Sequence, residues 1–294
     1  MKSPLFSGTC TAMVTPFLDD KINYPMLQRL LIRQMEAGIE AVVLFGTTGE
    51  CATLSDDEKT EILSKCKNIT GDQLLLIAAT GSNNTEHAVQ LSKKAQQAGA
   101  DGLLVISPYC NKATENGLIT HYSAIAQSVT IPIILYNVPS RTGLDMPVSA
   151  YRCLSNLPNV VGVKEASTDM EKILKIRTLC PESFQIWCGN DSLITPCMAL
   201  GAQGVISVIS NLLPHRMKQL TDFALSGNYT RTASMQRSLY PLMQAVFREI
   251  NPVGIKAAMS IAGFDCGGCR LPLGNASEET LAELNGFFPK KSAL

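Results

Sequence analysis

The sequence predicts an α/β protein that folds as a (β/α)₈ TIM barrel with a C-terminal helical extension. Eight short apolar segments recur along the chain, and amphipathic segments separate them. Most of the apolar segments are continuous rather than alternating, which is typical of parallel strands buried on both faces. Eight strands that alternate with helices favour a closed barrel. A doubly wound open sheet is the alternative, but the glycine-rich nucleotide-binding motif expected after its first strand is missing.

Local signals place the individual elements. We expect strands at residues 10–15, 41–45, 74–79, 102–107, 133–136, 160–164, 184–188 and 204–207. Two of the intervening helices each have one apolar face, formed by Leu27, Leu30, Leu31 and Met35 in the first and by Ala88, Leu91, Ala95 and Ala98 in the second. Capping boxes predict two helix starts, at Ser55–Glu58 and at Thr168–Glu171. Glycine adopts the left-handed conformation at little cost, and it ends three helices, at Gly38, Gly99 and Gly201.

The strand pattern stops after about residue 211, and helical segments continue to the end of the chain. Breaks in this helical region are expected near Gly227, Pro252, Gly267–Gly268 and Pro272. We therefore predict a catalytic barrel over residues 1–220 and a helical extension over residues 221–294 that packs on the barrel.

Composition limits the classes of function. The chain has 294 residues, 46% of them hydrophobic and 17% charged, with a formal net charge of zero. No basic stripe supports binding to nucleic acid or to a membrane surface. No apolar run approaches the ~18–20 residues that a membrane span needs, and the apolar stretch in residues 1–8 is too short for a signal peptide. These features predict a soluble cytoplasmic protein.

The ten cysteines do not predict a disulfide framework, because eight of them are scattered singly along the chain. We expect them to be small buried side chains in a reducing compartment. Cys266 and Cys269 have the spacing of a metal or redox pair, but a second pair of zinc ligands is missing. The three histidines, His87, His121 and His215, are dispersed, and surface positions are expected for them. We predict no metal site.

Lys164 is the most informative residue, because it ends the predicted strand at residues 160–164. An unpaired lysine there loses hydration, which favours the neutral amine. A neutral amine is what Schiff-base chemistry with a keto acid requires. The alternative is a lysine that extends to the rim of the sheet or pairs with a carboxylate.

Other strand ends supply groups that fit the same chemistry, since active sites of such barrels lie at the carboxyl ends of the strands. The turn at residues 46–50 brackets Thr47 and Thr48 with glycines, and its hydroxyl and N–H groups suit a small carboxylate. Tyr136 is a candidate proton relay and Arg141 a candidate clamp for a second carboxylate. Taken singly, each has an ordinary structural explanation. Together they indicate a keto acid bound as an imine, and hence a class I aldolase-type lyase or synthase.

Three motifs, at residues 46–50, 136–143 and 162–166, closely resemble those of the dihydrodipicolinate synthase (4-hydroxy-tetrahydrodipicolinate synthase) family. Residues 204–208 and the Asn251-Pro252 segment fit as well, and the resemblance covers essentially the whole chain. The first two motifs together are specific. The lysine motif alone is shared with the wider pyruvate-aldolase superfamily, which includes N-acetylneuraminate lyase.

The resemblance implies a lyase of the carbon–oxygen class that acts in lysine and diaminopimelate biosynthesis without metal or organic cofactor. Lys164 would form a Schiff base with pyruvate, and Tyr136 with Thr47 would move the proton that gives the enamine. The enamine would attack aspartate semialdehyde. Binding roles are implied for Thr48 and Ile206 toward pyruvate, and for Arg141, Gly189 and Asn190 toward the second substrate. The family is usually a homotetramer built as a dimer of dimers.

Two departures from the family pattern stand out. Members usually have two adjacent tyrosines after strand four, the second of which reaches the relay across the dimer interface. Here Tyr109 matches the first and Cys110 replaces the second, so we expect lower turnover or a repacked interface, with imine formation intact. We expect Cys110 to be buried and unreactive.

The second departure concerns the allosteric site of lysine-inhibited members. Asp56 and Lys59 stand where those members have histidines, and His87 stands where they have a glutamate; Asn83 and Tyr109 still match. His87 cannot replace the carboxylate that would pair with the α-ammonium group of lysine. We therefore predict a degenerate site without feedback inhibition by lysine.

Two other functions remain open. Another class I pyruvate aldolase, acting on a sugar acid or a hydroxy-keto acid, is disfavoured by Arg141, which sialate lyases typically lack. A catalytically silent pyruvate-binding paralogue is favoured only by Cys110, and the intact Lys164, Tyr136 and Thr47 argue against it.

Overall fold

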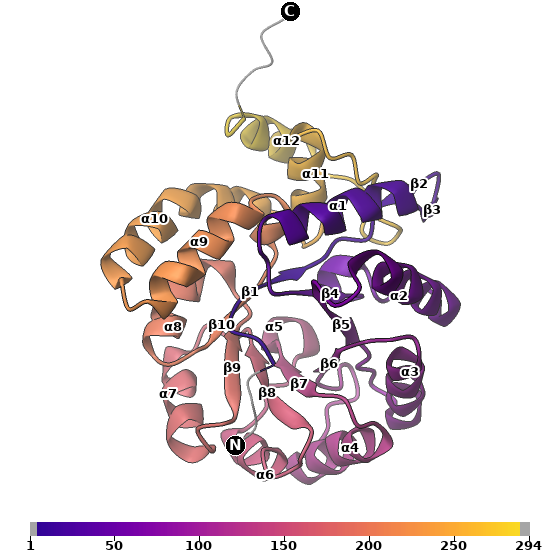
Figure 1. Cartoon of the computed structure of the whole chain (residues 1–294), viewed down its shortest axis with the longest axis vertical. Coiled ribbons are helices and arrows are strands. Elements are labelled where there is room, and N and C mark those ends of the chain that lie inside the picture. The colour runs from indigo at the N-terminus through magenta and orange to yellow at the C-terminus, as the bar shows by residue number, and fades with distance from the viewer. Residues whose placement is uncertain (1–4, 289–294) are drawn as a thin grey trace, which may run out of the picture.

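A computed structural model of the chain describes residues 5–288. Eight parallel strands form a closed barrel in the order β1-β10-β9-β8-β7-β6-β5-β4, surrounded by helices (Figure 1). The barrel strands are β1 (Gly8–Ala12), β4 (Ala41–Leu44), β5 (Leu75–Ala79), β6 (Gly102–Ile106), β7 (Ile133–Asn137), β8 (Val160–Glu165), β9 (Gln185–Cys188) and β10 (Gly204–Ser207). The predicted (β/α)₈ barrel is confirmed.

Seven of the predicted strands agree with the structure to within one residue at each end, but the first does not. Strand β1 begins at Gly8, because Gly8 and Thr9 pair with the start of β10. Met13 and Val14 are buried beyond the end of β1, and the Val14 N–H bonds the side chain of Asn211 at 3.1 Å. Their burial continues the apolar pattern past the strand. The short hairpin of β2 (Phe17–Leu18) and β3 (Lys21–Ile22) was not predicted.

The helices that cover the barrel follow the predicted pattern of buried faces. Leu27, Leu30 and Leu31 are buried in α1, as are Ala88, Leu91 and Ala95 in α3. The long elements are α1 (Tyr24–Glu36), α2 (Asp56–Thr70), α3 (Thr85–Gln97), α4 (Glu115–Ser128), α6 (Val148–Leu154), α7 (Met170–Leu179), α8 (Ile194–Ala199) and α9 (Pro214–Leu225). Short helical turns follow four strands, namely η1 (Thr47–Gly49), α5 (Pro139–Thr142), η2 (Asp191–Leu193) and η3 (Ile209–Asn211).

Helix boundaries confirm most of the predicted signals. The capping box of Ser55 and Glu58 opens α2, and Gly38, Gly99 and Gly201 all have positive φ. The box predicted at Thr168 is wrong. Asp169 is the N-cap of α7, and its carboxylate accepts a hydrogen bond from the Lys172 N–H at 3.3 Å.

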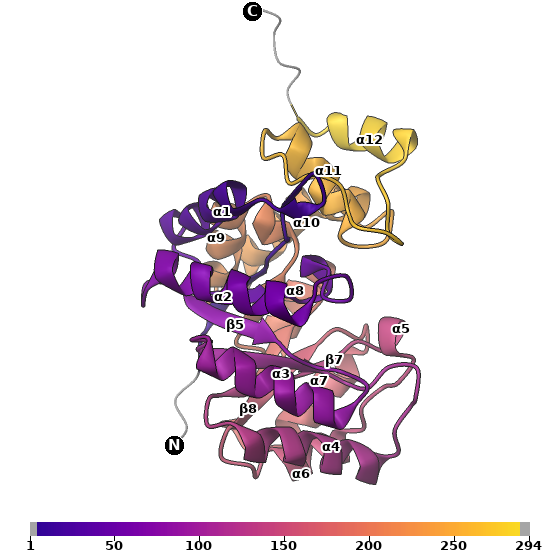
Figure 2. The ribbon, with the colours of Figure 1, turned by 90° about the vertical axis from the view of Figure 1, so that its right-hand side faces the viewer.

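The C-terminal region consists of α10 (Tyr229–Val246), α11 (Val253–Ile261) and α12 (Glu278–Asn285). The predicted boundary after residue 220 lies within α9, which packs against β1 and β10. Figure 2 shows α11 and α12 displaced toward the same side as α5, which follows the carboxyl end of β7. The extension therefore reaches the end of the barrel where the chemistry was predicted. Residues 1–4, on which part of the signal-peptide argument depended, and residues 289–294 of the extension lie outside the described region. None of the helices in the described region has the length and apolar character to span a bilayer.

His121 is buried, with 5% of its surface exposed, so the expected surface position is wrong. It lies on the inward face of α4, where its Nδ1 shares a hydrogen bond with the Thr85 hydroxyl at 2.9 Å. Its Nε2 has no partner among the described residues. Burial lowers the pKa of the imidazole, because the charged form would lose hydration without a compensating partner.

This burial predicts a pH dependence of stability. The unfolded state binds a proton near pH ~6.5, whereas the folded state resists protonation until a lower pH. Stability is therefore lost as pH falls from about 7 toward the depressed folded pKa. In His121→Gln this loss should be smaller than in the wild type, when urea unfolding is compared at pH 7 and pH 5. An equal pH dependence in the two proteins would contradict the prediction.

A second prediction concerns Gly162, which precedes Lys164 by two positions in β8. A Cβ at Gly162 would lie 2.3 Å from the Gln185 carbonyl oxygen of β9. We expect Gly162→Ala to lower the free energy of unfolding by about 1–3 kcal/mol, because the neighbouring strand must move. Gly117→Ala in α4 is the control, since its nearest non-bonded atom is 3.3 Å away and alanine favours a helix. Urea denaturation of both variants is the measurement. Equal free energies of unfolding for Gly162→Ala and Gly117→Ala would contradict the prediction, because β9 would then have moved without loss of stability.

Candidate active site

A cavity of about 310 Å³ opens at the carboxyl ends of the barrel strands. Seven of the residues predicted from the strand ends line it together: Thr47, Thr48, Tyr136, Arg141, Lys164, Gly189 and Asn190. Ile206 was predicted to line the same cavity but is not among the described residues that do so. It is 1% exposed within β10, and Val208, two positions nearer the mouth, lines the cavity instead.

Lys164 is buried at the centre of this cavity, with 6% of its surface exposed. Its neighbour across the strand pair is Tyr136, and the lysine Nζ lies 4.4 Å from the centroid of the tyrosine ring. None of the ion pairs formed within residues 5–288 includes Lys164. The expected alternative of a lysine paired with a carboxylate therefore does not hold.

Glu165 follows Lys164 and forms a separate polar network on the other side of β8. Its carboxylate accepts hydrogen bonds from the Asn137 side chain at 2.9 Å and from the Tyr151 hydroxyl at 3.2 Å. Burial raises the pKa of Tyr151 well above its usual value, so the phenol stays protonated and donates. Lys172 completes the network at 3.8 Å from Glu165. The network ties the ends of β7 and β8, which carry Tyr136 and Lys164, to each other.

The turn after β4 is held from two directions. The Gly49 carbonyl accepts a hydrogen bond from the Thr15 hydroxyl at 2.7 Å, and a Cβ at Gly49 would lie only 3.1 Å from the Met13 carbonyl oxygen. On the other side, the Asn251 side chain donates to the Thr48 hydroxyl oxygen at 3.0 Å. The turn is fixed with Thr47 and Thr48 on the wall of the cavity.

Arg141 extends over the cavity from α5 and is exposed. Its Nη2 donates to the backbone carbonyl of Asn251 at 3.3 Å. Asn251, just before α11, therefore contacts both Arg141 and the turn at residues 46–50 that carries Thr47 and Thr48, which we call the threonine turn. It is 7% exposed, and its side-chain oxygen has no hydrogen-bond partner among the described residues. Its segment was noted in the sequence only as a family match, and no local pattern predicted this contact.

Asp191 is a second residue that the sequence did not identify as important. It is 2% exposed at the end of β9, and its Oδ2 accepts hydrogen bonds from the Val208 and Ile209 N–H groups at 2.8 and 3.1 Å. Burial raises the pKa of this carboxyl group. Asp191 thereby joins the loop containing Gly189 and Asn190 to the end of β10.

Comparison with known proteins identifies the family of this chain. A model of the Dihydrodipicolinate synthetase family matches residues 5–289. The chain belongs to this family. A 4-hydroxy-tetrahydrodipicolinate synthase from Thermoanaerobacter sp. (strain X514) is 43% identical to it over 99% of this chain and 98% of the relative. Another from Acetivibrio thermocellus is 39% identical over 95% of each chain. The solved structure of dihydrodipicolinate synthase from Aquifex aeolicus matches with a TM-score of 0.94 at 38% identity and covers 96% of each chain.

This member of the dihydrodipicolinate synthetase family has a second cavity, of about 340 Å³, beside the first. Asp56, Lys59 and His87, which were predicted to share a site, line it, but Asn83 of the same predicted site is not among the described residues that do so. Thr47 and Tyr136 form part of the wall of both cavities. The Asp56 carboxylate lies 3.2 Å from His87 Nε2 and 3.8 Å from Lys59 Nζ. The only carboxylate that lines this second cavity within the described region is therefore already in contact with the Lys59 ammonium group and the His87 ring.

The loop after β6 places Tyr109 and Cys110 away from the catalytic cavity of the same chain. Tyr109 lines the second cavity, and its carbonyl accepts a hydrogen bond from the Asn83 side chain at 3.2 Å. Cys110 has a positive φ of 70° and is exposed, so the expectation of a buried thiol is wrong. Cys153 is exposed as well, on α6.

Cys266 and Cys269 do not have the electrostatics of a redox pair. Burial raises the pKa of Cys266 to about 12 and that of Cys269 to about 11, and the thiolate is the reactive form of cysteine. Residues 5–288 contain no group of three or more His, Cys, Asp or Glu side chains with the arrangement of a metal site.

Proposed function

We propose that this protein condenses pyruvate with L-aspartate 4-semialdehyde to give 4-hydroxy-tetrahydrodipicolinate, a step of lysine and diaminopimelate biosynthesis. The observation that carries the proposal is a buried lysine without a carboxylate partner, beside a tyrosine and facing Arg141 across one cavity, in a chain of this family.

The first half of the reaction uses pyruvate. The carboxylate of pyruvate is held by the hydroxyl and backbone N–H groups of Thr47 and Thr48, and the Lys164 amine attacks the keto carbon. Loss of water gives a protonated imine, which withdraws electrons from the methyl group. Removal of a methyl proton then gives the enamine, with Tyr136 and Thr47 as the relay that carries this proton.

The second half uses the aldehyde. The Arg141 guanidinium binds the carboxylate of aspartate semialdehyde, because a planar donor pair fits a carboxylate well. Gly189 and Asn190 shape the same side of the cavity. The enamine carbon attacks the aldehyde carbon, and the amino group of the second substrate displaces Lys164 as the ring closes. Arg141 also favours aspartate semialdehyde over a sugar acid, which would be the substrate if the protein were another pyruvate aldolase.

The assembly and its regulation are part of the proposal. We propose a cytoplasmic homotetramer, arranged as a dimer of dimers, in which Cys110 faces the partner subunit. The second cavity, with Asn83 beside Tyr109, is a degenerate allosteric site. The Asp56 carboxylate is already held by His87 and Lys59, so lysine at millimolar concentration should leave the rate unchanged.

A coupled assay tests the function directly. Purified protein receives pyruvate and aspartate semialdehyde, and the downstream reductase reports the product through consumption of NADPH. Consumption should require both substrates and should fall by about 10³-fold or more in Lys164→Ala, because the covalent nucleophile is lost. Borohydride should trap a pyruvate adduct in the wild type and not in this variant. Trapping at full stoichiometry in Lys164→Ala would show that another amine is the nucleophile.

Replacing Cys110 with tyrosine tests the relay. A phenol is a stronger hydrogen-bond donor than a thiol, so Cys110→Tyr should raise kcat by about 10-fold or more without changing the yield of the trapped pyruvate adduct. Cys153→Tyr is the matched control, since Cys153 is also exposed but lies on α6. An unchanged kcat in Cys110→Tyr would mean that the relay does not pass through position 110.

A further inference from the structure

The C-terminal extension contacts the threonine turn through a fully buried ion pair. Lys256 on α11 and Glu50 at the end of η1 lie with Nζ and Oε1 2.6 Å apart, and their side chains are 2% and 0% exposed. Glu50 follows the turn directly, and its N–H donates to the Thr47 carbonyl at 3.1 Å. Glu50 is therefore paired with a residue of the extension, 206 positions later in the chain.

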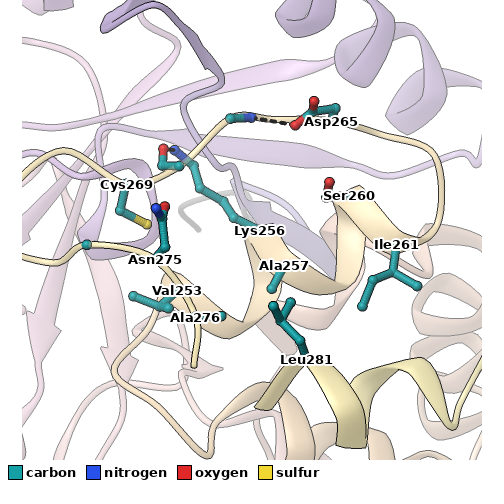
Figure 3. A pocket seen from close by; sticks show the side chains of 13 residues that line it. Val253, Lys256, Ala257, Ser260, Ile261, Asp265, Cys269, Asn275, Ala276 and Leu281 are labelled. Carbon is teal, nitrogen blue, oxygen red and sulfur yellow. Dashed lines mark hydrogen bonds between the residues drawn. The ribbon is translucent and has the colours of Figure 1, made fainter. Parts of the chain in front are cut away.

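Other groups of the protein contact both members of this pair. Lys256 Nζ also donates to the Gly268 carbonyl at 2.9 Å and lies 4.3 Å from the centroid of the Phe17 ring. The second oxygen of Glu50 accepts a hydrogen bond from the Arg270 N–H at 2.9 Å. Figure 3 shows Lys256 extending from α11 toward the loop that carries Cys269 and Asp265.

Lys256 also lines the cavity of about 270 Å³ in that view, but we do not assign its ammonium group to the binding of a ligand there. The Lys256 ammonium group already contacts the Glu50 carboxylate, the Gly268 carbonyl and the Phe17 ring. Its position suits a role toward the turn instead.

Arg270 extends the same contact to the start of α2. Its guanidinium donates to both oxygens of Glu58 at 2.7 and 3.0 Å and to the Thr53 carbonyl at 2.9 Å. Together with the bond from Asn251 to Thr48, the extension therefore holds the chain on both sides of the turn.

Electrostatics gives this pair a consequence for substrate binding. Without its partner, an ionised Glu50 would place a buried negative charge two positions after Thr48, in the turn that must accept the negative carboxylate of the keto acid. Such a charge acts strongly in a poorly hydrated environment, and burying it alone is unfavourable. Lys256 cancels it and leaves the N–H and hydroxyl groups of the turn to act on the substrate.

We propose that Lys256 is a positioning residue of the keto-acid site, which neutralises Glu50 and fixes the turn that binds the substrate carboxylate. The C-terminal extension thereby sets the affinity for the first substrate. This inference depends on the proposed function, in which pyruvate binds at Thr47 and Thr48.

The test compares two variants that leave opposite charges next to the site. In Lys256→Met the unpaired Glu50 should raise the KM for pyruvate by about tenfold or more. In Glu50→Gln the unpaired Lys256 should leave this KM unchanged or lower it. The double variant, with no buried charge, should bring the KM for pyruvate back to within about threefold of the wild type. In all three, the KM for aspartate semialdehyde should change by less than about threefold.

A purely structural role would move the two single variants in the same direction, so an equal rise of the pyruvate KM in both would overturn the proposal, as would no change in Lys256→Met. If Lys256→Met does not fold, Glu50→Gln and the double variant still decide: a tenfold rise of the pyruvate KM in either contradicts the role of charge. Lys218→Met is the matched control, because it breaks a pair with Glu40, 3.2 Å apart beside the start of β1 at the opposite end of the barrel. It should lower Tm and leave both KM values unchanged.

Borohydride trapping in the wild type separates a failure of this inference from a failure of the proposed function. Absence of a borohydride-trapped pyruvate adduct in the wild type would refute the proposed function itself. A trapped adduct, with a pyruvate KM that does not respond to the charge at positions 50 and 256, would refute only this inference.

Discussion

The site depends on closure of the barrel between its first and last strands. Gly8 pairs with Gly204, and a Cβ at Gly204 would lie 2.0 Å from the Gly8 carbonyl oxygen, so the two backbones can meet only because glycine stands there. Closure brings the carboxyl ends of all eight strands around one opening. Lys164 on β8 and the turn after β4 face each other across that opening only in the closed barrel.

The sequence predicted the elements whose signals are local. Strands buried on both faces appear as continuous apolar segments, and most of their ends were placed to within one residue. Errors arose where a residue is as buried as a strand residue but lies outside the strand, and where two neighbouring residues can both cap a helix. Met13 is as buried as a strand residue, yet it lies beyond the last residue of β1. At α7, Thr168 and Asp169 are both capping residues, and only the backbone geometry decides that Asp169 is the cap.

The difference between local and long-range signals also explains which site residues were predicted. Tyr136 and Lys164 were predicted to lie at one site because both end predicted barrel strands, and the structure pairs them on β7 and β8. Asn251 contacts Thr48 from 203 positions away, and no periodicity or spacing links the two. Asp191 was visible at a strand end, but its bonds to the N–H groups of Val208 and Ile209 depend on the loop conformation. Long-range polar contacts of this kind need the fold.

Three lysines are buried in the described part of the chain, and their partners differ in a way that bears on reactivity. Lys172 and Lys256 are 4% and 3% exposed and are both paired with carboxylates, Lys172 with Asp145 and Lys256 with Glu50. Lys164 is buried to nearly the same extent, and no such pair holds it. Two of the three buried amines are therefore held by carboxylates. The third, Lys164, lies at the position that shares a cavity with Thr47, Thr48 and Arg141.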